Sequence, residues 1–325
     1  MRWIKLPTAG VLVGLVLSSL AMAAENQPYP TRPIRFIVPF SPGGGTDFIG
    51  RLVALKLAEA LGQSVVVDNR SGAGGTIGTN IAAKAPADGY TILLSPIGLA
   101  VNVTLYEKLP YDTLKDLAPV SMLGHQPNIL VVHPSVPANS VGELLALVRS
   151  KPGQISYASG GFGAATYLAA ELLKLMAKIE MVHVPFKGSS PALRSVIGGE
   201  VQVFLSTFSL ALPQVKAGKV KALAVTTAKR SIFLPEVPTM DEAGVAGYEY
   251  RTWYGLLVPA GTSQPIISRL NTEVVKIITS TGIKEQLSMQ GVETTPTSPE
   301  QFGAFIRSEI AKWRKVLRAT GAKPQ

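Results

Sequence analysis

Residues 34–61 limit what this chain can fold into more than any other segment. The run Ile34-Arg-Phe-Ile-Val38 is apolar and mostly β-branched, which predicts a buried strand. From residue 48 to 61 apolar residues recur at helical spacing, which predicts an amphipathic helix. Gly43-Gly-Gly45 and Thr46-Asp47 join the two. Glycines let a ligand approach backbone N–H groups closely, and a helix start offers unpaired N–H donors and a positive dipole end. The unit therefore predicts a site for a small anionic group.

The glycine-rich turn does not match the common nucleotide-binding motifs. Gly45 and Gly50 have the spacing of a Walker A motif, but Arg51-Leu52 follows instead of Lys and a hydroxyl residue. Phe48 stands where the third glycine of G-x-G-x-x-G is needed. A purely structural alternative stays open for this motif alone, in which Thr46-Asp47 only caps the helix.

The unit of strand, glycine loop and helix recurs twice. Residues 64–68 predict a strand before Arg70-Ser-Gly-Ala-Gly-Gly-Thr76, and residues 154–159 predict one before Gly160-Gly-Phe-Gly-Ala-Ala-Thr166. Such alternation predicts a parallel or mixed sheet with helices on both faces. Ligands of these sheets bind at the carboxyl ends of the strands, where the three loops lie. Further strands are predicted at 90–95, 120–124, 128–134, 180–186, 201–206, 220–227 and 252–259; helices are predicted at 141–150, 167–177, 190–197, 209–217, 264–280 and 299–319, with a short one ending near Gly244.

The first 23 residues predict a cleavable signal peptide. Arg2 and Lys5 precede a short apolar stretch, and Ala21-Met-Ala23 has the small residues of a cleavage site. The apolar stretch is too short and too interrupted for a comfortable membrane span. The mature protein is therefore expected in the periplasm, and the absence of cysteine from the chain excludes thiol chemistry and disulfides.

The chain is basic, with a formal net charge of +10 that falls to +8 when Arg2 and Lys5 leave with the signal peptide. Its cations are dispersed and not interleaved with aromatic residues, so nucleic acid is not expected as a partner. A positive field also attracts anionic solutes. The one cluster, predicted to be a solvated helix face, consists of Arg307, Lys312, Arg314, Lys315 and Arg318.

An ordered series of segments from Tyr29 to the C-terminus resembles the Bug family, the periplasmic solute receptors of tripartite tricarboxylate transporters. No single segment is decisive, but their order is highly specific. The segments are 29–47, Asp68-Asn-Arg-Ser-Gly-Ala-Gly-Gly75, Ala87-Asp-Gly-Tyr-Thr-Ile-Leu-Leu94, Val184-Pro-Phe-Lys-Gly188, 218–225, 229–239 with its Leu-Pro-Glu-Val-Pro core, and Val258-Pro-Ala-Gly-Thr262.

The resemblance implies an α/β, two-domain periplasmic-binding-protein fold, type II-like, in which each domain is a mixed sheet flanked by helices and the ligand cleft lies between them. Residues 24–124 with 249–325 would form a discontinuous first domain, and residues 125–248 the second, with crossovers near 124–128 and 248–252. The implied protein is a monomer that binds a small carboxylate solute and delivers it to the transporter's membrane subunits. It is not an enzyme and needs no cofactor or metal.

In the family, backbone amides of the first two glycine loops hold a ligand carboxylate, and the second domain contributes a third loop. Carried onto this chain, the loops are 41–47, 71–75 and 159–166, the same three that the residues themselves indicate. The candidate ligand-binding residues are Phe40, Ser41, Gly43, Gly44, Thr46, Asp47, Gly72, Ala73, Gly74, Ser159, Gly163, Ala164, Ala165, Ser206 and Thr207.

The sequence departs from the family at Gln202, Ser206 and Thr207, where relatives often carry aspartates and an asparagine. Without a carboxylate there, an ammonium group would lack a counter-ion, which favours an organic acid over an amino acid. His183 and Lys187 are the alternative cations, each with a more ordinary structural explanation.

Two other functions would also suit an exported protein. An exported hydrolase has little support, because three histidines occur without a G-x-S-x-G elbow or paired carboxylates. A periplasmic receptor that presents its solute to a sensor protein would use the same cleft, so the sequence leaves that alternative open.

Overall fold

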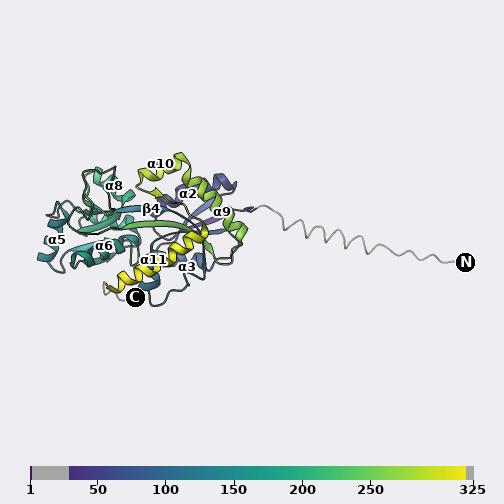
Figure 1. Cartoon of the computed structure of the whole chain (residues 1–325), viewed down its shortest axis with the longest axis horizontal. Coiled ribbons are helices and arrows are strands. Elements are labelled where there is room, and N and C mark those ends of the chain that lie inside the picture. Colours follow the sequence, from purple (N-terminus) through teal and green to yellow (C-terminus); the bar gives the residue numbers. More distant parts are fainter. Residues whose placement is uncertain (2–28, 320–325) are drawn as a thin grey trace.

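One long strand, β4 (Leu117–Val132), runs through the whole molecule and joins its two sheets (Figure 1). The computed structural model describes Met1 and residues 29–319, so the predicted signal peptide lies outside the described residues except for Met1. The first part of β4 pairs antiparallel with β9 (Arg251–Pro259) as far as Pro127. From Asn128 onward it pairs with β7 (Val203–Thr207) instead. The partner of β4 thus changes between Pro127 and Asn128.

The two sheets are both mixed. The first has the order β2 (Val65–Asn69), β1 (Ile34–Val38), β3 (Thr91–Pro96), β9 and β4, with the short β10 (Glu293–Thr294) on the other edge of β4. The second has the order β4, β7, β5 (Ser156–Ser159) and β6 (Val182–Pro185), with β8 (Lys221–Val225) on the other edge of β4. We call the parts built on these sheets the first and the second lobe.

Helices cover both faces of each sheet. Side chains alternate along β1, so that Ile34, Phe36 and Val38 join one apolar cluster and Ile37 joins the other. In the first lobe, α2 (Gly45–Leu61) and α9 (Gln264–Thr279) lie on one face, and α3 (Thr76–Ala83), α4 (Gly98–Leu105) and α11 (Pro299–Ala319) on the other. In the second lobe, α5 (Val141–Ser150) and α6 (Ala165–Ala177) lie opposite α7 (Ser189–Ile197) and α8 (Phe208–Lys216).

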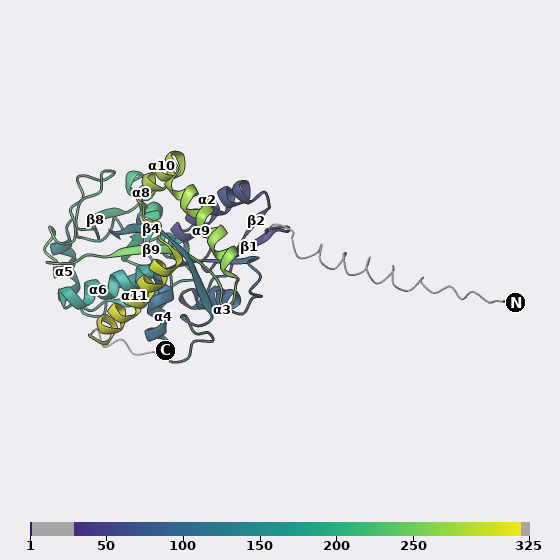
Figure 2. The same ribbon diagram turned by 45° about the vertical axis from the view of Figure 1, so that its right-hand side comes forward.

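Helix α11 packs across the sheet near the place where the chain crosses between the lobes (Figure 2). Glu309 accepts hydrogen bonds of 3.1 Å from the indole N–H groups of both Trp253 in β9 and Trp313 in α11. The ring of Trp313 also meets Tyr250 edge to face, with 5.8 Å between centroids. The second crossing segment is therefore held against the buried face of α11.

Most predicted elements are confirmed, and three predictions were wrong or incomplete. Residues 120–124 and 128–134 do not form two strands, because β4 continues through Pro127 with register shifts near Ser121 and Gly124. The short helix ending near Gly244 is a series of turns. Three elements had not been predicted: α4, α10 (Thr281–Met289) and β10.

The basic cluster near the C-terminus is exposed along α11, as predicted.

Among the described residues, none of the helices combines the length and the apolar character needed to cross a membrane.

Candidate functional site

The two lobes enclose a cavity of about 20 Å³ between them. We call it the inter-lobe cavity. The N-terminus of α2 and the loop before it form one wall, the starts of α6 and α7 with the end of β7 form the opposite wall, and β9 closes the floor. All of its lining side chains are neutral, and the lining residues are Phe40, Ser41, Gly44, Gly45, Thr46, Pro96, Ala164, Ala165, Ser189, Thr207, Thr252 and Tyr254.

The first glycine loop presents the start of α2 to this cavity. Gly43 has φ +79°, a conformation that favours glycine, and Gly44 is the extended N-cap residue. The first hydrogen bond of the helix runs from Phe48 N–H to Gly44 O at 3.0 Å. The N–H groups of residues 44–47 precede that bond, so the helix provides them no acceptor. The positive end of the helix dipole adds to their preference for an anion.

Asp47 holds this loop in shape. Its carboxylate is 4% exposed and accepts from Gly43 N–H at 2.9 Å, Arg51 Nε at 3.0 Å and Asn69 Nδ2 at 2.9 Å. The same Asn69 amide donates to Phe40 O at 3.0 Å. Burial alone would raise the pKa of Asp47, but the hydrogen bonds from Arg51, Gly43 and Asn69 outweigh it and lower the pKa. Asp47 is therefore an ionised loop support that does not line the cavity.

Three hydroxyl groups of the second lobe lie against the same glycines. Thr207 Oγ1, Ser190 Oγ and Ser209 Oγ are buried and form no hydrogen bond within residues 29–319. A Cβ atom placed on Gly45 would lie 2.9 Å from Ser209 Oγ and 3.1 Å from Thr207 Oγ1. One on Gly43 would lie 3.5 Å from Ser190 Oγ. Buried hydroxyls are nearly always hydrogen-bonded, so this cluster is suited to polar atoms of a guest between the lobes.

The second glycine loop makes a contact between the lobes and does not line the inter-lobe cavity. Gly74 has φ +60°, and a Cβ atom there would collide with the carbonyl oxygen of Phe162 in the second lobe. Ala73 and Gly74 line an outer groove of about 600 Å³ together with Phe162 and Lys187. Arg70, at the entrance of the loop, is exposed and pairs with Asp68 at 2.8 Å. Neither Arg70 nor Lys187 lines the inter-lobe cavity.

A serine–histidine pair joins the start of the third loop to β6. Ser159 Oγ lies 2.6 Å from His183 Nε2 and accepts from Gly161 N–H at 3.0 Å. His183 stacks on Tyr157 with 4.9 Å between ring centroids. Ser159 is fully buried, and His183 Nδ1 has no hydrogen-bond partner within the described residues, so no carboxylate there orients the imidazole as in a catalytic triad. The pair positions the loop at Gly161.

The stability of the protein is expected to depend on His183 between pH 4 and 6.5. Burial, with Lys174 nearby, lowers the pKa of His183 from 6.5 to about 4. In this range the unfolded chain binds more protons than the folded chain, so stability falls as the pH is lowered. His183→Gln keeps an amide for Ser159 but cannot titrate. The drop in thermal unfolding midpoint between pH 7 and pH 4.5 should be smaller in the variant than in the wild type; equal drops would contradict this role.

The structure brings together at the cavity seven of the residues predicted to bind ligand: Phe40, Ser41, Gly44, Thr46, Ala164, Ala165 and Thr207. The other eight lie elsewhere. Gly43 and Asp47 bond to each other behind the cavity wall, Gly72, Ala73 and Gly74 lie in the loop at the outer groove, Ser159 is bonded to His183, Gly163 packs against Asn102, and Ser206 donates to Thr207 O at 3.2 Å.

The sequence prediction missed Ser189, Ser190 and Ser209 in the second lobe and Thr252 and Tyr254 in β9. Gly188-Ser-Ser190 offered a signal, because it combines glycine and hydroxyl residues at a helix start as Gly45-Thr46 does. The hydroxyl of Tyr254 donates to Gln126 Oε1 at 2.7 Å, a contact between neighbouring strands whose residues lie 128 apart in sequence. Nothing local in the sequence points to that pair.

Comparison with known proteins assigns the architecture. Residues 49–322 match the family described as "Tripartite tricarboxylate transporter family receptor". BugT of Bordetella pertussis is 39% identical over 316 residues, covering 96% of this chain and 97% of BugT. The solved structure of the periplasmic binding protein BugD has a TM-score of 0.88 at 33% identity, covering 91% of this chain and all of that one. The predicted two-domain periplasmic-binding-protein fold is confirmed.

Two solved relatives carry organic acids. Rpa4515 of R. palustris, solved with adipate, has a TM-score of 0.88 and 38% identity, covering 91% of this chain and all of that one. MatC of Rhodopseudomonas palustris, with bound malate, has a TM-score of 0.85 and 32% identity, covering 89% of this chain and all of that one. The chain therefore belongs to the tripartite tricarboxylate transporter receptor family, the TctC or Bug proteins, which are periplasmic solute-binding receptors and not enzymes.

Proposed function

We propose that this protein captures a small organic acid between its lobes in the periplasm and delivers it to the membrane subunits of a tripartite tricarboxylate transporter. One observation carries the proposal. The unpaired N–H groups at the start of α2 face three buried hydroxyls of the other lobe that have no partner within residues 29–319. A carboxylate between them would receive hydrogen bonds from both lobes. Its binding would therefore hold the lobes together.

The site is suited to an acid that carries no ammonium group. Each hydrogen bond to a charged acceptor contributes on the order of 1.5–3 kcal/mol, so a few N–H and hydroxyl donors suffice for micromolar binding after association costs. The lining residues include no Asp or Glu that would neutralise an ammonium group. The adipate and malate of the solved relatives are acids of the proposed kind.

We propose that the lobes separate to admit the solute and close around it. A cavity of about 20 Å³ holds roughly one water molecule, whereas small-molecule sites measure about 300–1,000 Å³. Two crossing segments connect the lobes, β4 at Pro127–Asn128 and the approach to β9 at Tyr250–Arg251. Hinge rotation about two such segments is a common form of domain closure. We propose that the lobes are the two predicted domains, residues 24–124 with 249–325 and residues 125–248.

Removing the free hydroxyls is expected to weaken carboxylate binding without harming the fold. Ser190 and Thr207 are 8% and 4% exposed, and neither hydroxyl bonds to another group within residues 29–319. Ser190→Ala with Thr207→Val should lower the affinity for adipate or malate at least about 10-fold, the equivalent of one such hydrogen bond. Because no internal bond is lost, the unfolding free energy without ligand should stay the same or rise. Calorimetry measures the affinity, and denaturant unfolding measures the unfolding free energy.

The matched control is Ser195→Ala in the same helix. Ser195 is equally buried, but its hydroxyl donates to Ala192 O at 2.8 Å, so its loss should affect stability and leave affinity unchanged. A thermal-shift panel of mono-, di- and tricarboxylates, aromatic acids and amino acids identifies the preferred acid. Binding restricted to amino acids, or unaffected by the double variant, would contradict the proposal.

A further inference from the structure

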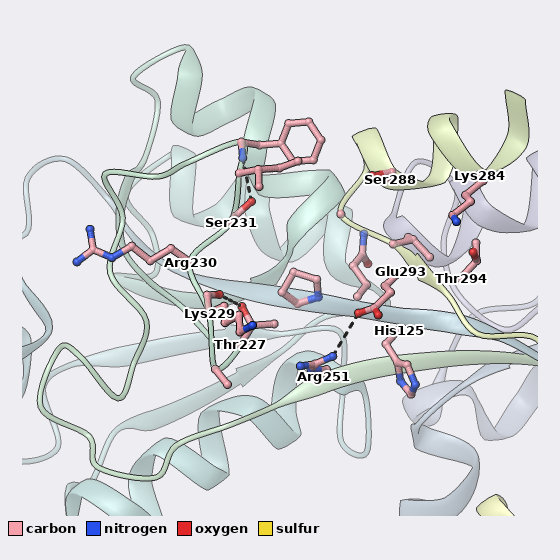
Figure 3. A pocket seen from close by; sticks show the side chains of 17 residues that line it. His125, Thr227, Lys229, Arg230, Ser231, Arg251, Lys284, Ser288, Glu293 and Thr294 are labelled. Atoms are coloured by element: carbon pink, nitrogen blue, oxygen red, sulfur yellow. Dashed lines mark hydrogen bonds and ion pairs between the residues drawn. The ribbon is translucent and has the colours of Figure 1, made fainter. Parts of the chain in front are cut away.

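The loop after β8 carries part of the family resemblance but contributes nothing to the inter-lobe cavity. Residues 227–233 instead form one wall of a groove of about 620 Å³ (Figure 3). The opposite wall is α10 with β10, including Lys284 and Ser288. The floor is the crossing part of β4 and β9, including Pro127 and Arg251. We call this the hinge groove.

The floor of the hinge groove is a gap in the sheet. On the edge of β4 opposite β9, the pairing with β10 ends at His125 and the pairing with β7 begins at Asn128. Pro127 lies in the gap and has no N–H to offer an added strand. The groove would therefore recognise a partner through its own side chains and not by pairing with an added strand.

Two cations of the groove are left without counter-ions. Arg251 pairs with Glu249 at 3.1 Å and Glu293 at 3.4 Å, and Arg230 pairs with Glu242 at 2.8 Å. Lys229 and Lys284, on opposite walls (Figure 3), form no ion pair within the described part of the chain.

Apolar side chains accompany these charges. Ile232 in the groove wall is 82% exposed, and Met289, next to Ser288 at the end of α10, is 55% exposed. Exposed apolar residues beside unpaired charges are typical of surfaces that bind another protein. The complement of this surface is an acidic segment that also carries an apolar side chain.

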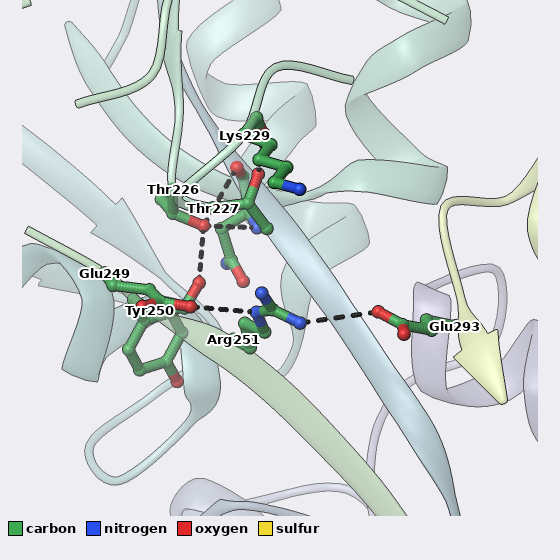
Figure 4. A network of polar contacts seen from close by, with 8 residues as sticks. Thr226, Thr227, Lys229, Glu249, Tyr250, Arg251 and Glu293 are labelled. Atoms are coloured by element: carbon green, nitrogen blue, oxygen red, sulfur yellow. Dashed lines mark hydrogen bonds and ion pairs between the residues drawn. The ribbon is translucent and has the colours of Figure 1, made fainter. Parts of the chain in front are cut away.

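The walls of the groove belong to different lobes, so its width depends on closure. Thr226, just before the first wall, ties both crossing segments together (Figure 4). Its carbonyl accepts from Tyr250 N–H at 2.8 Å, its hydroxyl donates to Tyr250 O at 2.8 Å, and that hydroxyl accepts from Asn128 N–H at 2.8 Å. The second wall is attached to the first lobe through α9 and β10. Rotation about the crossing segments changes the distance between Lys229 and Lys284.

We propose that the hinge groove is where a membrane subunit of the transporter recognises the closed receptor, by placing an acidic segment with an apolar side chain between Lys229 and Lys284. This inference rests on the proposed transport function. A partner that touches both walls binds the closed form better than the open form, and by linkage solute binding then strengthens docking. The groove does not touch the solute, so docking and solute binding can be separated by mutation.

The test reverses the charge on both walls. Lys229→Glu with Lys284→Glu should leave the calorimetric affinity for adipate or malate unchanged and should reduce uptake of the radiolabelled acid by cells that depend on this receptor at least about 10-fold. The control Lys151→Glu with Lys315→Glu makes the same change in net charge at two exposed lysines outside the groove and should support normal uptake.

A cross-link identifies the partner. Because the chain contains no cysteine, Ile232→Cys can be labelled uniquely with a benzophenone maleimide, and Val66→Cys, exposed on β2, serves as the control. Added to spheroplasts with the acid, the Ile232 probe should cross-link to an acidic segment of a transporter membrane subunit, and the Val66 probe should not.

The outcomes separate the two proposals. Normal uptake by the charge-reversed receptor, or cross-links from Ile232 only to a second receptor copy or to nothing, overturns the hinge groove as docking site and leaves transport intact. A wild-type receptor that binds the acid but supports no uptake contradicts the transport function itself, and the docking role with it.

Discussion

Gly74→Ala is expected to abolish tight binding of carboxylates while the protein stays folded. The added methyl group would collide with the carbonyl oxygen of Phe162, which belongs to the other lobe. The contact joins the two lobes, so the substitution should oppose the proposed closure. An alanine at φ +60° also carries backbone strain, which the control below takes into account. We expect adipate or malate to bind at least about 100-fold more weakly, a loss of roughly 2.7 kcal/mol.

Calorimetry measures the affinity, and small-angle scattering should show that saturating acid no longer reduces the radius of gyration. Gly62→Ala is the matched control, since Gly62 has φ +67° and would place its Cβ in open space. The Gly62→Ala variant should lose some stability but should bind adipate or malate normally. Normal binding by Gly74→Ala would contradict closure as the basis of affinity.

Asp47→Ala is expected to weaken binding strongly and also to destabilise the protein. The buried carboxylate accepts from a backbone N–H, an amide and a guanidinium, and its removal leaves Gly43 N–H and Asn69 without that acceptor. A loss of about 3 kcal/mol in unfolding free energy follows from the usual cost of such groups. The N–H groups at the start of α2 would then no longer be held in place.

Lowering the pH should reproduce part of the loss of stability expected for Asp47→Ala. The pKa of Asp47 is lowered on folding, so its contribution to stability is complete at neutral pH, begins to fall near the ordinary value of 3.8, and is lost through the lower folded value. Asp47→Asn should therefore flatten the acid limb of the stability curve. Asp112→Ala, an exposed aspartate that accepts from Leu114 N–H at 3.0 Å, is the control and should leave affinity unchanged. An unaltered affinity in Asp47→Ala would show that the loop does not need its support.

The spacing of apolar residues was enough to predict the elements in which that spacing is clear. Residues 34–38 and α2 have clear strand and helix patterns, and both were predicted. Helix α4 was missed because Gly98 to Asn102 are all buried, which leaves no polar face to mark its period. Strand β4 was divided in two because Gly124 and Pro127 interrupt its pattern. It stays one strand because each half has its own partner strands, which no local pattern reveals.

The sequence likewise predicted only part of the candidate site. The glycine loops and their helix starts follow from the sequence, and the first and third of them line the inter-lobe cavity. The different use of the second, as the contact of Gly74 with Phe162, depends on how the lobes meet. Ser190 and Ser209 belong to the site for the same reason, since their neighbours at Gly43 and Gly45 lie more than 140 residues away in sequence.

Amide hydrogen exchange at the start of α2, with and without saturating adipate or malate, tests the central claim most directly. If a carboxylate is held there by backbone donors, the amides of Gly44, Gly45 and Thr46 should exchange at least about 10-fold more slowly in the bound protein. The amide of Gly43, already bonded to Asp47, should change less. Saturable binding without any added protection at residues 44–46 would contradict the claim that this helix start holds the acid.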